Sequence, residues 1–401
     1  MKQTFMKRRG VALAVICAGA TLAAPAAGQD SGAPYGRAHA GERSAYARAT
    51  EESRELVREV MAAGGIPGLS IAVGVGGEIV WSEGFGLASV EFGVPVTTLT
   101  KFRSGSTSKP MTQAAASLLR EEGRFDFDAP IQTYVPSFPD KGHSITPRQL
   151  MAHTAGIRHY DPNGTEFYIT KHYEDWLGAL EIFADDPLLF EPGTDYSYST
   201  YGANLLGMAV QAAAGRDFYS VLKEHVFEPL GMRSTVGDHT DSIIPMRTAF
   251  YERTGQPPGY HRRQSSWGDG GGPGLLLNGP FSDNSNKRAG GGLLTTPEDL
   301  VRFGSAHLRP GFLRRDSLDE MLTSARLNDG TETGRGLNWT LGVDAVGRRY
   351  IGHGGGAVGG TTDLLVYLES GVVVAVQSNL TDAEYGDLVE EVAELFMHAS
   401  R

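Results

Sequence analysis

Cysteine is almost absent from this chain of 401 residues: the one cysteine, Cys17, lies in an apolar stretch near the N-terminus. We expect that stretch to be removed with a signal peptide, which leaves the remaining chain without a thiol. Such a chain forms no disulfide, has no cysteine nucleophile and offers no cysteine-based metal site. The apolar stretch itself, residues 11–22, is too short to span a bilayer comfortably, because a spanning helix needs about 20 apolar residues.

Two further sequence signals are missing. The glycine-rich segment 268–274 is not followed by Gly-Lys-Ser or Gly-Lys-Thr, so it does not match a phosphate-binding loop. No His-x-x-x-His pair or cysteine ligand joins His143, His153 or His159, and we expect these histidines to pack rather than to bind a metal. The sequence therefore predicts neither a metal site nor a bound cofactor.

Positive charge is scarce as well. The formal net charge is −11, and the first 28 residues hold four cations and no acids, so their removal leaves −15. This balance argues against nucleic acid or an anionic membrane as a partner, because both attract basic proteins. We expect a small-molecule or peptide substrate, and the sequence leaves the oligomeric state open.

The N-terminus has the three parts of an export signal. Four cations among the first nine residues precede the apolar stretch, and Ala24-Pro25-Ala26 matches the small-residue cleavage pattern. We expect residues 1–28 to be a signal peptide and the Gly-, Ala- and Ser-rich residues 29–43 to be a flexible leader. The prediction is an exported protein, periplasmic or extracellular, without a stable membrane anchor after the signal is removed.

Strand patterns occur at both ends of the remaining chain. The periodicity predicts a helix over 45–63 and then a hairpin around Gly76-Gly77. Near the other end, a second hairpin turns at residues 369–371, and a last helix is expected over 383–398.

The middle of the chain is mostly helical. Thr146-Pro147 and Thr296-Pro297 each place a capping threonine before a proline that fits the first helical turn. The pattern predicts an α+β fold, in which one antiparallel sheet is built from both termini and a helical region is inserted in it. We expect one catalytic domain over 44–401, with an α/β part at about 44–110 and 290–401 and a helical part at about 111–289.

A Ser-x-x-Lys pattern occurs twice, at Ser106–Lys109 and at Ser220–Lys223. A serine nucleophile needs a base within hydrogen-bond reach, and side chains three residues apart on a helix share one face. Pro110 fits a first turn, so we expect a helix to begin near Ser106, where free N–H groups favour developing negative charge. Taken alone, this serine is either a nucleophile or a helix cap. Ser220 lies in a plain amphipathic pattern and is interpreted as a surface serine.

Six segments in the same order resemble the serine β-lactamase-related hydrolases, a family that includes class C β-lactamases, D-alanyl carboxypeptidases and esterases. The segments are FRSGSTSKPMT, GRFDFDAPIQTYVP, ITPRQLMAHTAGI, EPGTDYSYSTYGANLLG, AGGGLLTTPEDLVRFG and GHGGGAVGG. They cover about 65–380, and their order is more specific than any one of them. The resemblance implies a β-lactamase/transpeptidase-like fold, with the sheet flanked by helices.

The resemblance also assigns roles to residues. Its first motif implies that Ser106 is the acylated nucleophile and Lys109 its base. Its second motif falls on Tyr198-Ser199-Thr200 and implies that Tyr198 relays a proton to the leaving group, provided that nearby lysine keeps its phenol easily ionised. Thr200 replaces the expected asparagine, which offers an acceptor and two donors to a substrate amide.

The third motif is Lys-Thr-Gly in β-lactamases and falls here on His353-Gly354-Gly355. Histidine removes a permanent cation that would hold a β-lactam carboxylate. Glycines such as Gly355 let a substrate backbone approach the strand edge closely. By the same resemblance, the N–H groups of Gly356 and Ser106 would form the oxyanion hole. Arg253-Thr254-Gly255 imitates the β-lactamase motif but is expected to be a hairpin turn.

Together these residues predict an exported serine hydrolase that acts through an acyl-enzyme on an ester, amide or peptide carbonyl. Thr200 and His353, and a similarity to mitochondrial serine β-lactamase-like proteins, favour an esterase or peptidase. Two alternatives remain: a true β-lactamase or D,D-carboxypeptidase, and a catalytically silent protein that binds cell-wall or peptide ligands. The retained Ser106, Lys109 and Tyr198 argue against the silent protein.

Overall fold

A computed structural model describes residues 44–253 and 275–400. The expected signal peptide, the leader, Cys17, the glycine-rich segment and the Thr254-Gly255 part of the motif mimic lie outside these residues. The helices are α1 (Ala47–Gly64), α2 (Ser108–Glu121), α3 (Pro147–Ala152), α4 (Thr200–Ala214), α5 (Phe218–Leu222), α6 (Arg288–Gly291), α7 (Pro297–Ser305), α8 (Arg315–Met321) and α9 (Leu388–Ala399). The strands are β1 (Gly68–Val75), β2 (Glu78–Ser89), β3 (Val94–Pro95), β4 (Phe102–Arg103), β5 (Val236–Gly237), β6 (Tyr251–Arg253), β7 (Leu276–Asn278), β8 (Leu293–Thr295), β9 (Thr340–Val343), β10 (Arg349–Ala357), β11 (Gly360–Tyr367) and β12 (Val372–Ser378).

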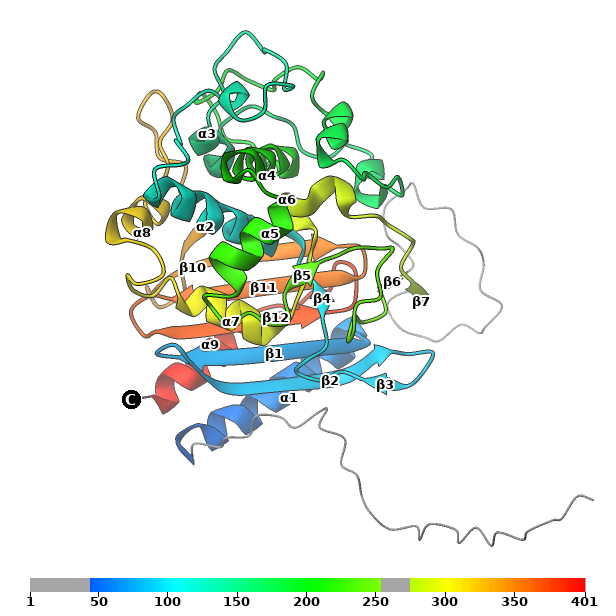
Figure 1. Cartoon of the computed structure of the whole chain (residues 1–401). Helices are drawn as coiled ribbons and strands as arrows, with labels where there is room; N and C mark the ends of the chain where they lie inside the picture. The colour runs from blue at the N-terminus through cyan, green and yellow to red at the C-terminus, as the bar shows by residue number, and fades with distance from the viewer. Residues whose placement is uncertain (1–43, 254–274, 401) are drawn as a thin grey trace, which may run out of the picture. The chain divides into compact units, whose positions relative to one another are not determined.

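Seven strands form one antiparallel sheet in the order β3-β2-β1-β12-β11-β10-β9 (Figure 1). β1 from the N-terminal part pairs with β12 from the C-terminal part, with Leu69 opposite Ser378. This pairing confirms the expected sheet built from both ends of the chain. Both expected hairpins are also present, and Gly76, Gly77 and Gly371 at their turns have the positive φ that favours glycine.

Alternate residues of the central strands pack against different helices. In β1, Ile71 and Val73 join a core with α1 and α9, whereas Ala72 between them joins the larger core that contains α7. The two-residue period of a strand sends successive side chains to opposite faces. Because helices cover both faces, the central strands are nearly continuous apolar runs.

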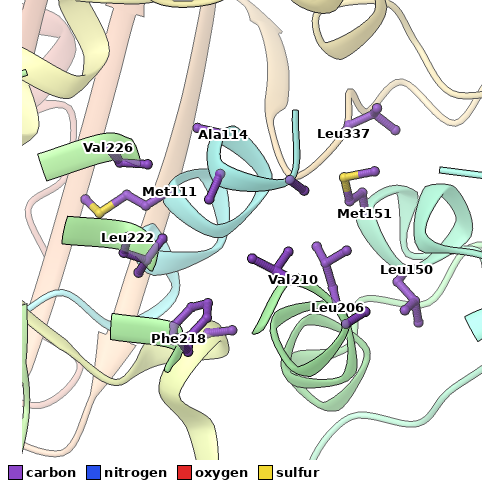
Figure 2. Packing of buried hydrophobic residues seen from close by; sticks show 14 of the residues in the cluster. Met111, Ala114, Leu150, Met151, Leu206, Val210, Phe218, Leu222, Val226 and Leu337 are labelled. Carbon is purple, nitrogen blue, oxygen red and sulfur yellow. The ribbon is translucent and has the colours of Figure 1, made fainter. Parts of the chain in front are cut away.

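α4 is the central helix of the helical region. Nearly all its residues are buried, and Figure 2 shows Leu206 and Val210 of α4 beside side chains of α2, α3 and α5. At Gly207 an added Cβ would lie 2.4 Å from the Cβ of Ala289, so the missing side chain lets α4 lie directly against α6. This contact places α6 next to the start of α2. None of the helices within the described ranges is long and apolar enough to cross a membrane.

The two predicted helix starts are confirmed. The Thr146 hydroxyl accepts the N–H of Gln149, and the Gln149 side chain accepts the N–H of Thr146, which completes a capping box. The Thr296 hydroxyl accepts the N–H of Asp299 at the start of α7.

The last helix begins later than the sequence predicted. It was expected from residue 383 and begins at Leu388. Before it, Gly386 has a φ of 55°, and the Tyr385 hydroxyl donates to the carbonyl oxygen of Thr361 at 2.6 Å. This segment is therefore a loop fixed to the sheet, because contacts with β11 replace the helical hydrogen bonds.

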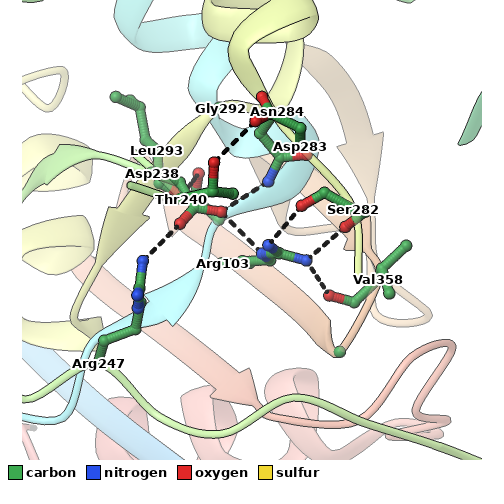
Figure 3. Close-up of polar contacts among 12 residues, drawn as sticks. Arg103, Asp238, Thr240, Arg247, Ser282, Asp283, Asn284, Gly292, Leu293 and Val358 are labelled. Atoms are coloured by element: carbon green, nitrogen blue, oxygen red, sulfur yellow. Dashed lines mark hydrogen bonds and ion pairs between the residues drawn. The ribbon is translucent and has the colours of Figure 1, made fainter. Parts of the chain in front are cut away.

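A buried ion pair anchors the segment that leads to Ser106 (Figure 3). Arg103 is 3% exposed, and its Nε donates to Asp238 Oδ2 at 2.8 Å. Its Nη1 donates to the carbonyl oxygen of Val358 at 2.8 Å. Arg103 precedes Ser106 on the chain and Val358 follows Gly356, so one guanidinium ties together the two segments expected to form the oxyanion hole.

We predict that Asp238→Asn lowers the free energy of unfolding by about 3–5 kcal/mol, because it leaves the Arg103 cation buried without its counter-charge. Urea denaturation of the purified protein measures the change. Asp241→Asn, at an exposed carboxylate in the same loop, is the matched control and should have little effect. Equal stability of the two variants would contradict the importance of the ion pair.

Candidate active site

Ser106 lies in a single 3₁₀ turn, Gly105–Thr107, directly before α2. The φ of Gly105 is 50°, and a Cβ at this position would lie 2.6 Å from the carbonyl oxygen of Gly356. On the other side of the turn, the Ser104 hydroxyl donates to the carbonyl oxygen of Leu293 in β8 at 3.0 Å. The turn is therefore fixed between β10 and β8, and only glycine fits before the serine.

Lys109 brings a buried amine to this turn. Its Nζ lies 2.8 Å from Ser106 Oγ and donates to the carbonyl oxygen of Gly290 at 2.8 Å, and the lysine is 0% exposed. Ser106 itself is only half-buried. Burial lowers the pKa of Lys109 well below its usual value, and the charge of Lys287 lowers it further. This shift favours the uncharged amine, which is the form that can accept the hydroxyl proton.

Asn204 of α4, to which the sequence gave no role, holds the carbonyl partner of Lys109. Its Oδ1 accepts the N–H of Gly290 at 2.9 Å, and its Nδ2 donates to the carbonyl oxygen of Asn286 at 3.1 Å. Lys287 lies within the segment so held, and burial lowers the pKa of this lysine to about 7. The repeated glycines of the AGGGLL segment could have indicated that its backbone lies close to another element, because glycine permits such close approach.

Tyr198 lies beside Lys109, in the loop before α4. Lys109 Nζ is 4.9 Å from the centroid of the phenol ring. Burial raises the pKa of Tyr198 above its usual value, although the contact with the Ser106 hydroxyl opposes the rise. The expectation of an easily ionised phenol is therefore not met: the phenol keeps its proton and can donate it.

Two histidines that were expected only to pack also hold the Tyr198 loop. His153 Nδ1 accepts the N–H of Ser199 at 3.2 Å, and His159 Nδ1 accepts the N–H of Thr200 at 3.1 Å. Their rings lie 4.5 and 5.5 Å from the ring of Tyr198. Each bond needs an unprotonated Nδ1, and burial lowers the pKa of His153 well below its usual value and that of His159 to about 4.

The described part of the chain contains no arrangement of side chains that fits a metal site. Within residues 44–253 and 275–400, no group of three or more His, Cys, Asp or Glu side chains could hold a metal ion. His143, the third histidine considered from the sequence, is exposed and lies 3.7 Å from Glu191.

Thr200 and Gly355 were expected to contact substrate, and both are buried against other parts of the protein. Thr200 is 2% exposed, and its methyl group would lie 2.5 Å from a Cβ at Gly290, so it packs behind the lysine rather than facing solvent. Gly355 is buried, and a Cβ there would lie 2.1 Å from the carbonyl oxygen of Ser104. Its missing side chain makes room for the nucleophile turn of the protein itself.

β10 presents an open edge beside Ser106. It pairs with β11 from Tyr350 to Ala357 but with β9 only from Arg349 to Gly352. In the described chain, its second edge therefore has no strand partner from His353 onward. Gly354 and Gly356 are exposed along this stretch. Unpaired backbone groups at a sheet edge can pair with an extended ligand.

His353 lies at the start of the open edge. It is half-buried, and its Nδ1 is 2.6 Å from the carbonyl oxygen of Gly354. Burial lowers the pKa of His353 to about 3. The third motif therefore supplies no cation at neutral pH, in keeping with the sequence argument.

A cleft of about 320 Å³ adjoins Tyr198 and His353. The other residues that line it are His153, Tyr196, Arg335, Gly336, Asn338, Trp339, Thr340 and Gly354. The cleft thus lies against the open edge of β10, on the side of Tyr198.

The second Ser-x-x-Lys has none of these features. Lys223 has 69% of its side chain exposed and lies 3.6 Å from Glu228 rather than at Ser220. The Ser220 N–H donates to Asp217, which caps α5. Ser220, which was interpreted as a surface serine, is a half-buried residue of α5 without a lysine amine beside it.

A family model and the similar proteins of known sequence agree on one family. The family model described as Beta-lactamase matches residues 54–395. The serine beta-lactamase-like protein LACTB, mitochondrial, of Homo sapiens is 30% identical over 81% of this chain and 73% of its own. The esterase EstB of Burkholderia gladioli is 29% identical over 66% of this chain and 71% of its own.

Solved structures show the same fold. The octameric penicillin-binding protein homologue from Pyrococcus abyssi superposes with a TM-score of 0.70 at 23% identity, over 87% of this chain and 77% of that one. This likeness confirms the β-lactamase/transpeptidase-like fold.

We predict that Gly355→Ala lowers the free energy of unfolding by about 1–3 kcal/mol, because the methyl group overlaps the Ser104 carbonyl oxygen. Gly356→Ala is the matched control, because its Cβ meets only Asp382 Oδ1, at 4.0 Å, and its unfolding free energy should stay close to that of the unchanged protein. Thermal or urea unfolding measures both. If the two variants lose equal stability, the packing of β10 against the nucleophile turn is wrong.

Because His153 and His159 hold the Tyr198 loop with unprotonated rings, we expect the protein to lose stability in acid. Below pH 6.5 the unfolded chain binds a proton at His159, whereas the folded chain binds it only near the pKa of about 4. The unfolding free energy should therefore fall as pH falls through this window, by at most about 1.4 kcal/mol per pH unit for each such histidine.

His159→Gln tests this origin, because glutamine can still accept the Thr200 N–H but takes up no proton. Urea denaturation across the same pH window should give a shallower slope for this variant. His143→Gln, at an exposed histidine, is the control and should leave the slope unchanged. An unchanged slope in His159→Gln would remove His159 from the explanation.

Proposed function

The chain belongs to the beta-lactamase family of serine hydrolases, and we propose that it cleaves an ester or amide bond through an acyl-enzyme formed on Ser106. The observation that carries this proposal is the buried amine of Lys109, which lies 2.8 Å from Ser106 Oγ and has a lowered pKa. A serine hydroxyl becomes an effective nucleophile when a neighbouring base takes its proton. The half-buried position of Ser106 leaves the hydroxyl within reach of a substrate.

In the first half of the reaction, Lys109 accepts the Ser106 proton while Oγ bonds to the substrate carbonyl carbon. The negative charge on the carbonyl oxygen is stabilised by the N–H groups of Ser106 and Gly356. The close packing of Gly105 against Gly356 supports this pairing of donors. When the tetrahedral intermediate collapses, the Tyr198 phenol gives its proton to the leaving group and regains one from the Lys109 ammonium.

In the second half, water attacks the acyl-enzyme. Lys109, neutral again, and Tyr198 accept and return the proton of the water, the carboxylic acid leaves, and the Ser106 hydroxyl is restored. The buried Asn204 contributes by holding the carbonyl oxygen of Gly290 at Lys109 Nζ. These steps need only groups of this chain and water.

We infer that the substrate is a small ester or a peptide-like amide that lies along the open edge of β10. The unpaired stretch from His353 supports an extended ligand, and the uncharged imidazole of His353 gives no cation for a β-lactam carboxylate at the third motif. The similarity to a protein named as an esterase supports the same choice. A true β-lactamase or D,D-carboxypeptidase would need its cation from another residue.

We also propose that the protein is exported. The basic, apolar and small-residue parts of the N-terminus support this location. One similar protein is named as mitochondrial, and the proposed destination of this protein rests on the N-terminal pattern alone.

A fluorophosphonate probe should label the protein covalently at Ser106, because it reacts with activated serine hydroxyls. Ser106→Ala should abolish the labelling, and Lys109→Met should slow it by at least about 100-fold, since it removes the base. Ser220→Ala is the matched control at the second Ser-x-x-Lys and should label like the unchanged protein. Labelling that survives in Ser106→Ala would overturn the proposal, and no labelling at all would favour a silent binding protein.

A further inference from the structure

Thr200 lies where the rings of His159, Tyr160 and Tyr198 come together. It is the first residue of α4, and its N–H donates to His159 Nδ1 at 3.1 Å. The His159 ring stacks on the ring of Tyr160, with 4.3 Å between the ring centroids. The same imidazole meets the ring of Tyr198 edge-on at 5.5 Å. One backbone hydrogen bond therefore fixes Thr200 beside the imidazole that contacts both phenols.

The two branches of the Thr200 side chain have different neighbours. The methyl group faces Gly290, where an added Cβ would lie 2.5 Å from it. The hydroxyl interacts with the phenols of both Tyr198 and Tyr160. Because Thr200 is only 2% exposed, little water competes for this hydroxyl. The hydroxyl therefore links the phenol beside Ser106 to a second phenol farther from the nucleophile.

Tyr160 is suited to be the donor at the far end of this link. Burial raises the pKa of Tyr160 above its usual value, and the contact with Thr200 opposes the rise. The phenol therefore keeps its proton at neutral pH. A hydroxyl group has one hydrogen to donate and accepts bonds through its oxygen. When the Thr200 oxygen accepts from Tyr160, the Thr200 hydrogen is left for the oxygen of Tyr198.

We propose that Thr200 is a positioning residue for the transfer of the Tyr198 proton to the leaving group, and that its hydroxyl donates to Tyr198 Oη. This role rests on the proposed function and names the substrates for which it matters: esters and amides with weakly acidic leaving groups. Negative charge develops on the phenol oxygen as the proton departs, and a donor already in place stabilises that charge. The Thr200 proton stays on its own oxygen, and Tyr198 regains a proton from the Lys109 ammonium.

Threonine suits this role better than the asparagine expected at the second motif. Its hydroxyl donates and accepts at one atom, so it can link two phenol oxygens, whereas asparagine divides these capacities between an oxygen and a nitrogen. The methyl group of Thr200 fills the space against Gly290. The departure from the motif therefore supports the proton donor rather than the binding of a substrate amide.

The test separates the hydroxyl of Thr200 from its methyl group. Thr200→Val keeps the methyl group that faces Gly290 and removes the hydroxyl, whereas Thr200→Ser keeps the hydroxyl and removes the methyl group. The measurement is kcat/KM for the ethyl and 4-nitrophenyl esters of acetic acid. Ethanol is a far weaker acid than 4-nitrophenol, so the ethyl ester depends much more on a proton from Tyr198.

Thr200→Val should lower the ratio of kcat/KM for the ethyl ester to that for the 4-nitrophenyl ester by about 10-fold or more, the size expected for a hydrogen bond to a charged group. Thr200→Ser should keep the ratio. Tyr160→Phe should lower it by a smaller factor, because the Thr200 hydrogen is then free to turn away from Tyr198. This second variant decides the question if Thr200→Val does not fold.

Two control variants remove hydroxyl groups that do not contact Tyr198. Thr235→Val removes a buried threonine hydroxyl that donates to Asp299 at 2.9 Å. Tyr201→Phe removes a phenol that donates to Glu166 at 2.9 Å and belongs to the residue next to Thr200. Both variants should keep the ratio of the unchanged protein.

Equal losses on the two esters in Thr200→Val, or a lower ratio in Thr200→Ser than in Thr200→Val, would overturn the role of the hydroxyl while the proposed function stands. If neither ester is cleaved and Ser106 takes no fluorophosphonate, the proposed function fails and this role fails with it.

If Ser106 is labelled but neither ester is cleaved, fluorine NMR of protein that contains 3-fluorotyrosine replaces the kinetics. Tyr198→Phe identifies the Tyr198 resonance by its absence. This resonance should shift in Thr200→Val, which lacks the donor to the phenol oxygen, and stay in place in Thr200→Ser. An unshifted resonance in Thr200→Val would overturn the hydrogen bond.

Discussion

The burial of the Lys109 amine between the Ser106 hydroxyl and the Gly290 carbonyl oxygen is the constraint on which the rest of the site depends. An amine in water at neutral pH is protonated and cannot take a proton from serine. Removing it from water makes the uncharged form stable, but it requires a folded wall on every side. α2 supplies the lysine, and the Asn204-held segment before β8 supplies the acceptor. The helical region therefore serves the chemistry as well as the core.

The sequence predicted much of this fold because its signals are local. Turn glycines at Gly76 and Gly371, the caps at Thr146 and Thr296, and strand patterns at both ends each depend on neighbouring residues, and all are found. The start of the last helix was misplaced because a distant hydrogen bond of Tyr385 to the sheet outweighs the local helical pattern. Local periodicity carries no information about such a partner.

In the site too, contacts between neighbouring residues were predicted, and contacts between distant segments were not. The three-residue spacing of Ser106, in the 3₁₀ turn, and Lys109, in the first turn of α2, predicted their contact. The bonds of His153 and His159 to the Tyr198 loop, in contrast, join segments that no local pattern relates. Thr200 and Gly355 were assigned to substrate because the motif places them next to reacting residues. The structure shows that Thr200 packs against Gly290 and that Gly355 makes room for Ser104, and both contacts depend on packing in three dimensions.

The open edge of β10 creates a risk of aggregation, and its glycine-rich composition reduces this risk. A free strand edge is also a place where another protein molecule can add a strand and begin to aggregate. Here the unpaired stretch begins at His353 and continues through Gly354, Gly355 and Gly356, and glycine disfavours the extended pairing that a long intermolecular ladder needs. The same glycines that let the nucleophile turn approach thus leave an edge that is short and weak as a template for self-association.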